Sequence, residues 1–169
     1  MIQRFTFGCP LPTESVVLLV EPAAAAVPYL TAEPDGSWSF SLAEDAVVYG
    51  LGEMPRGINK RGWHYVTDNT DESHHGENRL SYYGAHNFLL IDGGAGRSVF
   101  GVFVDFPGKV FYDIGYTRHD RLTFRTEEPD YDLYILTGDS PNAVCTEFRK
   151  LIGHSYIPPK WAFGFAQSR

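Results

Sequence analysis

Short stretches in which apolar and polar residues alternate recur along most of the chain. The clearest is residues 37–42, where every second residue is apolar, a period typical of a β-strand with one buried face. Turns rich in glycine, proline and aspartate separate the stretches, and Pro107-Gly108 is expected to form a tight hairpin. Many short strands with no helix between them favour an antiparallel sandwich or barrel. The other predicted strands are residues 47–51, 63–67, 87–91, 98–106, 109–114, 121–125 and 131–136.

The two ends of the chain show weaker patterns. Residues 1–35 look irregular apart from 16–20, an apolar run that predicts a buried strand ended by Pro22. The alanines at 23–26 are interpreted as a turn or loose connection, because Pro28 follows too soon for a helix.

One amphipathic helix is expected near the C-terminus. Ser140 offers an N-cap, Pro141 suits the first helical position, and Gly153 suits the position after the last turn. Between them the apolar residues fall at helical spacing. They are Val144, Phe148, Leu151 and Ile152.

The pattern changes after this helix. Residues 154–159 end in Pro158-Pro159 and predict a rigid extended linker. Residues 161–165 then predict a new buried strand. We therefore divide the chain into residues 1–153, a β-sandwich domain, and residues 154–169, a linker and the first strand of a second domain.

Composition and charge narrow the function classes. The chain has 169 residues, of which 43% are hydrophobic and 15% aromatic, and its formal net charge is −7. An acidic chain whose basic residues are scattered has no basic patch to bind nucleic acid or anionic lipid. Neither a signal peptide nor an apolar run long enough to span a membrane is visible, so a cytoplasmic location is the default. Cys9 and Cys145 are expected to be free thiols.

Motifs for phosphate, metal or nucleophilic chemistry are weak. Residues 93–96 are glycine-rich but lack the strand–loop–helix frame of a phosphate cradle. His74-His75 lack metal-ligand spacing, and Cys145 is interpreted as a packing residue of the helix. No cofactor, metal ligand or catalytic residue is predicted. The carboxylates Asp68, Asp71, Glu72 and Glu77 gather in one stretch, which we interpret as a solvated loop.

This loop mixes its carboxylates with aromatic residues. Carboxylates accept hydrogen bonds from sugar hydroxyls, and aromatic faces cover the apolar face of a sugar ring. Long polar loops between strands commonly carry binding residues. The residues alone therefore make a sugar-binding loop one candidate, and they leave a solvated loop, in which Asp71 only caps the backbone, as the more favoured interpretation.

Several short segments, taken together in their order along the chain, resemble a known family. They are Tyr49-Gly50-Leu51-Gly52-Glu53, Asn69-Thr70-Asp71, Tyr83-Gly84-Ala85-His86-Asn87-Phe88, Gly101-Val102-Phe103 to Asp105, and Pro158-Pro159-Lys160-Trp161-Ala162-Phe163-Gly164-Phe165-Ala166-Gln167-Ser168-Arg169. In this order they resemble family 31 glycoside hydrolases, most nearly compact bacterial α-glucosidases. The first four resemble the family's N-terminal domain, and the last resembles the entry into its catalytic (β/α)8 barrel.

The resemblance implies a mainly β fold. It would be an antiparallel β-supersandwich like that of galactose mutarotase with one C-terminal helix, followed by the first strand of a truncated (β/α)8 barrel. It also implies that the loop containing Asp71 projects over the barrel mouth. There Asp71 would hydrogen-bond the sugar in the leaving-group (+1) position, and Thr70 beside it is the second expected substrate-binding residue.

The catalytic acids of that family have no counterpart in this chain. The family's nucleophile lies in a Trp-x-Asp-Met segment on a later barrel strand, and this segment is missing from the sequence. A complete barrel takes about 250 residues, far more than follow Gly153.

The function implied is that of a non-catalytic module of a retaining α-glucosidase that releases terminal α-linked glucose from oligosaccharides. Its partners would be an α-glucoside substrate and the barrel, with no nucleic acid or membrane. Three alternatives stay open: a free-standing carbohydrate-binding sandwich, a mutarotase-like epimerase, and a purely structural spacer.

Overall fold

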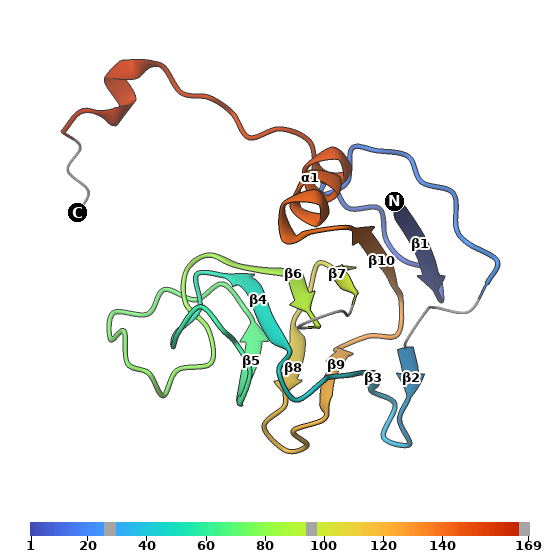
Figure 1. Cartoon of the computed structure of the whole chain (residues 1–169). Coiled ribbons are helices and arrows are strands. Elements are labelled where there is room, and N and C mark those ends of the chain that lie inside the picture. The colour runs from blue at the N-terminus through green and yellow to red at the C-terminus, as the bar shows by residue number, and fades with distance from the viewer. Residues whose placement is uncertain (26–29, 94–97, 166–169) are drawn as a thin grey trace.

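The computed structural model describes residues 1–25, 30–93 and 98–165, which form two β-sheets with one α-helix beside them (Figure 1). The elements are β1 (Ile2–Phe7), β2 (Leu30–Ala32), β3 (Trp38–Ser41), β4 (Val47–Gly52), β5 (Trp63–Thr67), β6 (Ala85–Asp92), β7 (Val99–Asp105), β8 (Val110–Ile114), β9 (Arg121–Thr126), β10 (Tyr131–Gly138), α1 (Pro141–Ile152) and the 3-10 helix η1 (Lys160–Phe163).

Each sheet has five strands, and every neighbouring pair is antiparallel. Sheet A has the order β1-β10-β7-β6-β4, and sheet B has the order β2-β3-β9-β8-β5. This arrangement confirms the mainly β sandwich fold that the alternation predicts.

The main hydrophobic core lies between the two sheets. Alternate residues of each strand point inward, so Leu133 and Ile135 of β10 meet Leu122 and Phe124 of β9 in one buried cluster. Every one of these four side chains is at most 1% exposed. Because side chains in a strand alternate between faces, the pattern in the sequence sets which residues enter this core.

A second hydrophobic cluster lies on the outer face of sheet A, under α1. Leu90 and Leu136 project outward from the sheet, and Val144 and Leu151 of the helix cover them. The helix begins and ends as predicted: the Ser140 side chain accepts a hydrogen bond from a backbone N–H of the first turn. The amphipathic stripe of α1 therefore serves to close this face.

The run 16–20 is not a strand, contrary to the prediction. It crosses the end of α1, where the backbone N–H groups of Val17 and Leu18 both donate to the carbonyl of Leu151, at 2.9 and 3.2 Å. A helix leaves its last carbonyls without partners, so this apolar run caps the helix instead of joining a sheet. The N-terminal region is also less irregular than expected, because it contains β1 and β2.

Pro107-Gly108 does not form the predicted tight hairpin. The turn joins β7 of sheet A to β8 of sheet B, and these two strands do not pair. Turn residues indicate where a chain reverses, but they do not tell which sheet receives the next strand.

The predicted strand at residues 161–165 is also wrong. Residues Lys160–Phe163 form the single turn η1, and the segment leaves the sandwich after α1 (Figure 1). Trp161, Phe163 and Phe165 are 82%, 74% and 96% exposed. Within the described residues no strand lies beside this segment to share backbone hydrogen bonds, so its N–H groups bond locally.

Candidate functional site

The loop of residues 68–84 joins β5 in sheet B to β6 in sheet A and projects from the sandwich (Figure 1). Its two ends run side by side. The Thr70 N–H donates to the carbonyl of Tyr82 at 3.0 Å, and the Ser81 hydroxyl donates to the carbonyl of Asp68 at 2.7 Å. The loop therefore has a defined stem held by its own hydrogen bonds.

Two glycines of β4 allow this strand to lie close to the end of the loop and to β6. Gly50 has φ +121° and Gly52 has φ +73°. A Cβ on Gly50 would lie 2.2 Å from the carbonyl oxygen of Phe88, and one on Gly52 would lie 2.2 Å from that of Gly84. The Glu53 N–H donates to the same Gly84 carbonyl at 2.8 Å. The Tyr-Gly-Leu-Gly-Glu segment thus has a local physical explanation.

The tip of the loop is held by its aromatic side chains. The Tyr82 hydroxyl donates to the carbonyl of Gly76 at 3.0 Å, and the Tyr83 hydroxyl donates to the carbonyl of Glu72 at 2.8 Å. An ion pair of 3.0 Å between Arg79 and Glu72 adds a further link across the tip. Aromatic residues here fix the loop as well as lining its surface.

Asp71 and Thr70, the two predicted site residues, are both exposed on this loop. The Thr70 hydroxyl donates to the carbonyl of Asp68 at 2.9 Å. Desolvation and the neighbouring Asp71 carboxylate raise the pKa of Tyr83, so this carboxylate lies beside the phenol hydroxyl. The structure therefore brings a carboxylate, a hydroxyl and an aromatic ring together at the loop surface.

The four carboxylates of the loop do not converge on one point. Asp68 pairs with Lys109 at 2.9 Å, whereas Glu72 pairs with Arg79. Among the described residues, no group of three His, Cys, Asp or Glu side chains is arranged to hold a metal ion. His74 and His75 are exposed, and the His75 ring packs edge-on against two tyrosines.

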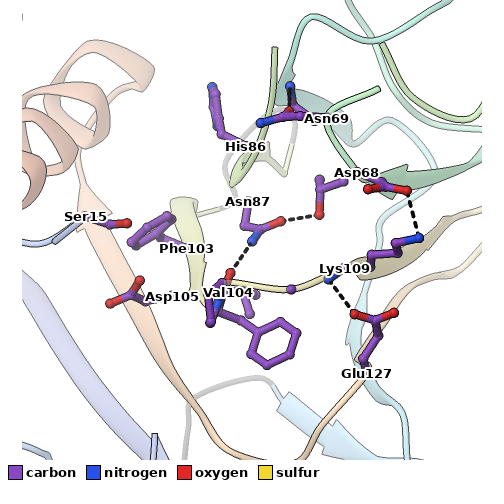
Figure 2. A pocket seen from close by; sticks show the side chains of 15 residues that line it. Ser15, Asp68, Asn69, His86, Asn87, Phe103, Val104, Asp105, Lys109 and Glu127 are labelled. Carbon is purple, nitrogen blue, oxygen red and sulfur yellow. Dashed lines mark hydrogen bonds and ion pairs between the residues drawn. The ribbon is translucent and has the colours of Figure 1, made fainter. Parts of the chain in front are cut away.

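A hollow of about 490 Å³ lies at the base of the loop, and we call it the stem pocket (Figure 2). Its walls come from the loop stem, from β6 and β7, and from the connection between β7 and β8. Asp68 and Asn69 are part of its lining, whereas Asp71 and Thr70 are not. The pocket is thus adjacent in sequence to the predicted residues but formed by others.

Hydrogen bonds and one ion pair hold the polar side chains of the stem pocket in place. Asn87 accepts a hydrogen bond from the Thr67 hydroxyl and donates to the carbonyl of Phe106 at 3.4 Å, which joins the two sheets at this end. The Lys109 backbone N–H donates to Glu127 at 3.0 Å while its ammonium group pairs with Asp68. Figure 2 shows Asn87 between the charged group around Lys109 and Asp105.

Asp105 is the most buried acid of the pocket lining, at 9% exposure. Desolvation raises the pKa of Asp105, and the nearby Asp132 carboxylate raises it further. The Thr13 hydroxyl donates to it at 2.6 Å. Asp132 has a different environment, because Arg4 binds it through two hydrogen bonds of 3.0 and 2.8 Å.

Other expectations from the sequence can be placed. Cys9 and Cys145 are free, as predicted, but Cys145 is exposed and does not pack in the helix interface as expected. Gly93 is described, whereas the rest of the glycine-rich run and Arg169 lie outside the described residues. No helix in residues 1–25, 30–93 and 98–165 has the length and apolar character needed to cross a bilayer.

Comparison with known families explains this arrangement. Residues 25–113 match the glycosyl hydrolase 31 N-terminal galactose mutarotase-like domain. The chain belongs to this family. The match includes β2 to β7 and all but the last residue of β8, and therefore the whole loop 68–84 with both predicted site residues.

Relatives are similar over most of this chain but are much longer. α-Glucosidase 2 of Bacillus thermoamyloliquefaciens is 33% identical over 133 residues, which are 77% of this chain and 16% of that protein. An α-xylosidase of Lactiplantibacillus pentosus is 32% identical over 73% of this chain and 15% of its own length. The dextranase of Flavobacterium johnsoniae, solved with glucose, superposes with a TM-score of 0.69 and 25% identity, covering 83% of this chain and 17% of that one.

The stem pocket was not predicted from the sequence. Lys109, Asn87 and Asp105 lie in predicted strands, where an isolated polar residue looks like ordinary alternation. Only the crossing of the chain from one sheet to the other brings them together. A polar residue at an inward-facing strand position, such as Asn87, was the available signal.

Proposed function

We propose that this chain is the N-terminal, non-catalytic module of a retaining α-glucosidase, and that Asp71 and Thr70 contact the sugar in the +1 position. The observation that carries the proposal is the exposed Asp71 beside Tyr83, on a loop whose stem and tip are both fixed. A loop held in place before the substrate arrives loses little conformational freedom on binding.

The relatives support an α-glucoside substrate. They are named as α-glucosidases and an α-xylosidase, and the dextranase was solved with glucose and, as a variant, with isomaltotriose. In the longer enzyme, a barrel would supply the nucleophile and the acid/base, with a covalent glycosyl intermediate between them. The module would shape the rim where the leaving sugar sits. Its cytoplasmic location stays a prediction from the sequence.

The division at residues 153 and 154 is part of the proposal. Residues 1–153 would form the sandwich module, and residues 154–169 would lead into the barrel. Support comes from the exposed side chains of Trp161, Phe163 and Phe165, which need a partner to be shielded from water.

The test compares two substrates in the longer enzyme. Asp71→Ala should lower kcat/KM for maltose or isomaltose by about tenfold or more, which corresponds to the loss of one charged hydrogen bond. Hydrolysis of an activated aryl glucoside should change little, because its leaving group does not need the same contacts. Glu77→Ala, an exposed acid of the same loop, is the matched control. Equal losses on both substrates would contradict a leaving-group role.

The free-standing carbohydrate-binding sandwich is the alternative. It is tested by reading the native gene beyond the Arg169 codon. An open frame that encodes a Trp-x-Asp-Met segment supports the module, and a stop codon supports the free-standing protein.

A further inference from the structure

We propose that the stem pocket is a second carbohydrate-binding site, which takes one neutral hexose ring of a glucan and is separate from Asp71 and Thr70. The proposal does not depend on the proposed +1 contact, because none of its residues belongs to that contact. Its volume of about 490 Å³ lies within the range of small-molecule pockets, about 300–1,000 Å³.

The hydrogen-bonding groups of the pocket suit hydroxyls. The Lys109 ammonium has three N–H donors and is 45% exposed while it pairs with Asp68, whose side chain is 39% exposed. The Asn69 side chain accepts from the backbone N–H of Ala85 at 2.7 Å, which leaves its amide NH₂ group directed elsewhere. A sugar hydroxyl both donates and accepts, so it can bond to the ammonium and the carboxylate at the same time.

The charges of the pocket disfavour an anionic ligand. Lys109 is balanced by Asp68 on its side chain and contacts Glu127 through its backbone N–H. Desolvation lowers the pKa of His86, which disfavours the positively charged form of its imidazole. Among the described lining residues, Lys109 is the one Lys or Arg, and it already pairs with Asp68. A phosphate or carboxylate ligand would therefore have no unpaired cation to bind and would face Asp105.

The pocket also has an apolar side for the C–H face of a ring. Phe106 and Pro107 are part of its lining, and Phe106 is partly exposed. These residues sit on the connection between β7 and β8, directly before Lys109. An apolar surface next to converging donors and acceptors is the general arrangement of a small-ligand site.

The experiment is a titration of the 169-residue chain with maltose and with isomaltose, followed by the backbone amide NMR signals. The signals of Asn69, Asn87 and Lys109 should shift in a saturable manner at millimolar sugar. Lys109→Met should weaken the affinity by about tenfold, because one charged hydrogen bond is lost, and Lys109→Arg should restore most of it. Glucose 6-phosphate should bind more weakly than glucose.

Two controls separate this site from the others. Glu77→Ala changes an exposed acid of the loop outside the pocket lining and should leave the shifts of the lining signals unchanged, and Arg125→Met changes a guanidinium on the outer face of sheet B with the same expectation. Thermal unfolding of each variant should match that of the parent chain. The proposal is overturned if the lining signals do not move, if they move equally in Lys109→Met, or if the shifts are confined to residues 71–84.

Discussion

The outer faces of the two sheets differ, although both sheets are built from the same alternation. Sheet A presents Leu90 and Leu136 outward, and α1 covers them with a second apolar cluster. Sheet B presents polar residues such as Thr123 and Arg125 outward, and no helix of the described chain packs on it. A strand with apolar residues on both faces needs a cover on each side. The polarity of every second residue thus decides which sheet receives the helix.

The largest expected effect is on the covered face. Leu136→Ala, at a fully buried position of the second cluster, should lower the free energy of unfolding by about 2–5 kcal/mol, because it leaves a cavity under α1. The matched change on sheet B, Thr123→Ala, should cost less than about 1 kcal/mol. Urea unfolding of both variants measures the difference. Equal losses would show that α1 adds no buried packing.

An intermediate effect is expected from the two ion pairs on these faces. Arg4 binds Asp132 through two nitrogens, whereas Arg121 binds Glu33 through one. Arg4→Met should lower the free energy of unfolding by about 1–3 kcal/mol, since the buried Asp132 carboxylate loses its cationic partner and keeps only the hydrogen bond from the Thr6 hydroxyl.

Arg121→Met is the companion variant on sheet B, and it should cost less than about 1 kcal/mol. Urea unfolding at low and high salt tests both variants. A larger loss for Arg121→Met would reverse the comparison.

The two faces should also respond oppositely to pH. Burial raises the pKa of Asp105, so its contribution to stability is present at low pH and is lost as pH rises through its folded pKa. Desolvation of Asp113 is outweighed by hydrogen bonds from Thr117, the Tyr116 N–H and His64, which lower the pKa of Asp113. Its contribution is present above its unfolded pKa of about 3.9 and is lost as pH falls through the folded pKa.

Two substitutions isolate these contributions. Relative to that of the parent chain, the free energy of unfolding of Asp105→Asn should rise between pH 3 and pH 7. That of Asp113→Asn should fall over the same range. Chemical unfolding across that range measures the two slopes. Slopes of the same sign would contradict the assignment.

The smallest effect is expected outside the sandwich. Trp161 is 82% exposed, so Trp161→Ala should change the free energy of unfolding of this chain by less than about 0.5 kcal/mol. The same substitution should cost several times more in the longer enzyme if the segment packs against a barrel. Thermal unfolding of both forms gives the comparison, and a large loss in the 169-residue chain would show packing that this structure lacks.

Sequence patterns predicted the eight strands from β3 to β10 and helix α1, because each buries at least one face over several residues. They failed where a partner decides the conformation. Val16–Val20 has the apolar run of a strand, yet two of its N–H groups donate hydrogen bonds to a carbonyl at the C-terminal end of α1. In β1, the apolar Phe5 and Phe7 alternate with Arg4 and Thr6, which is also a pattern typical of a strand.

The candidate site was predictable only in part. The residues themselves predicted a loop at this segment, the family resemblance singled out Asp71 in it, and the structure confirms that the loop is exposed at Asp71. The stem pocket depends on the crossing from β7 to β8, which separates two strands that looked like a hairpin. Local turn chemistry carries no information on such long-range pairing.

The pairing of β1 with β10 has a consequence for synthesis. Ile2 lies opposite Leu136, so β1 can meet its hydrogen-bonding partner only after the eight strands β2 to β9 have been synthesised. Until β10 emerges, the edge of β1 has no partner, and contacts between such distant residues form slowly. The nascent chain must therefore keep an apolar, strand-forming segment out of wrong pairings while β2 to β9 are synthesised, which makes β1 a place where chaperone binding is expected.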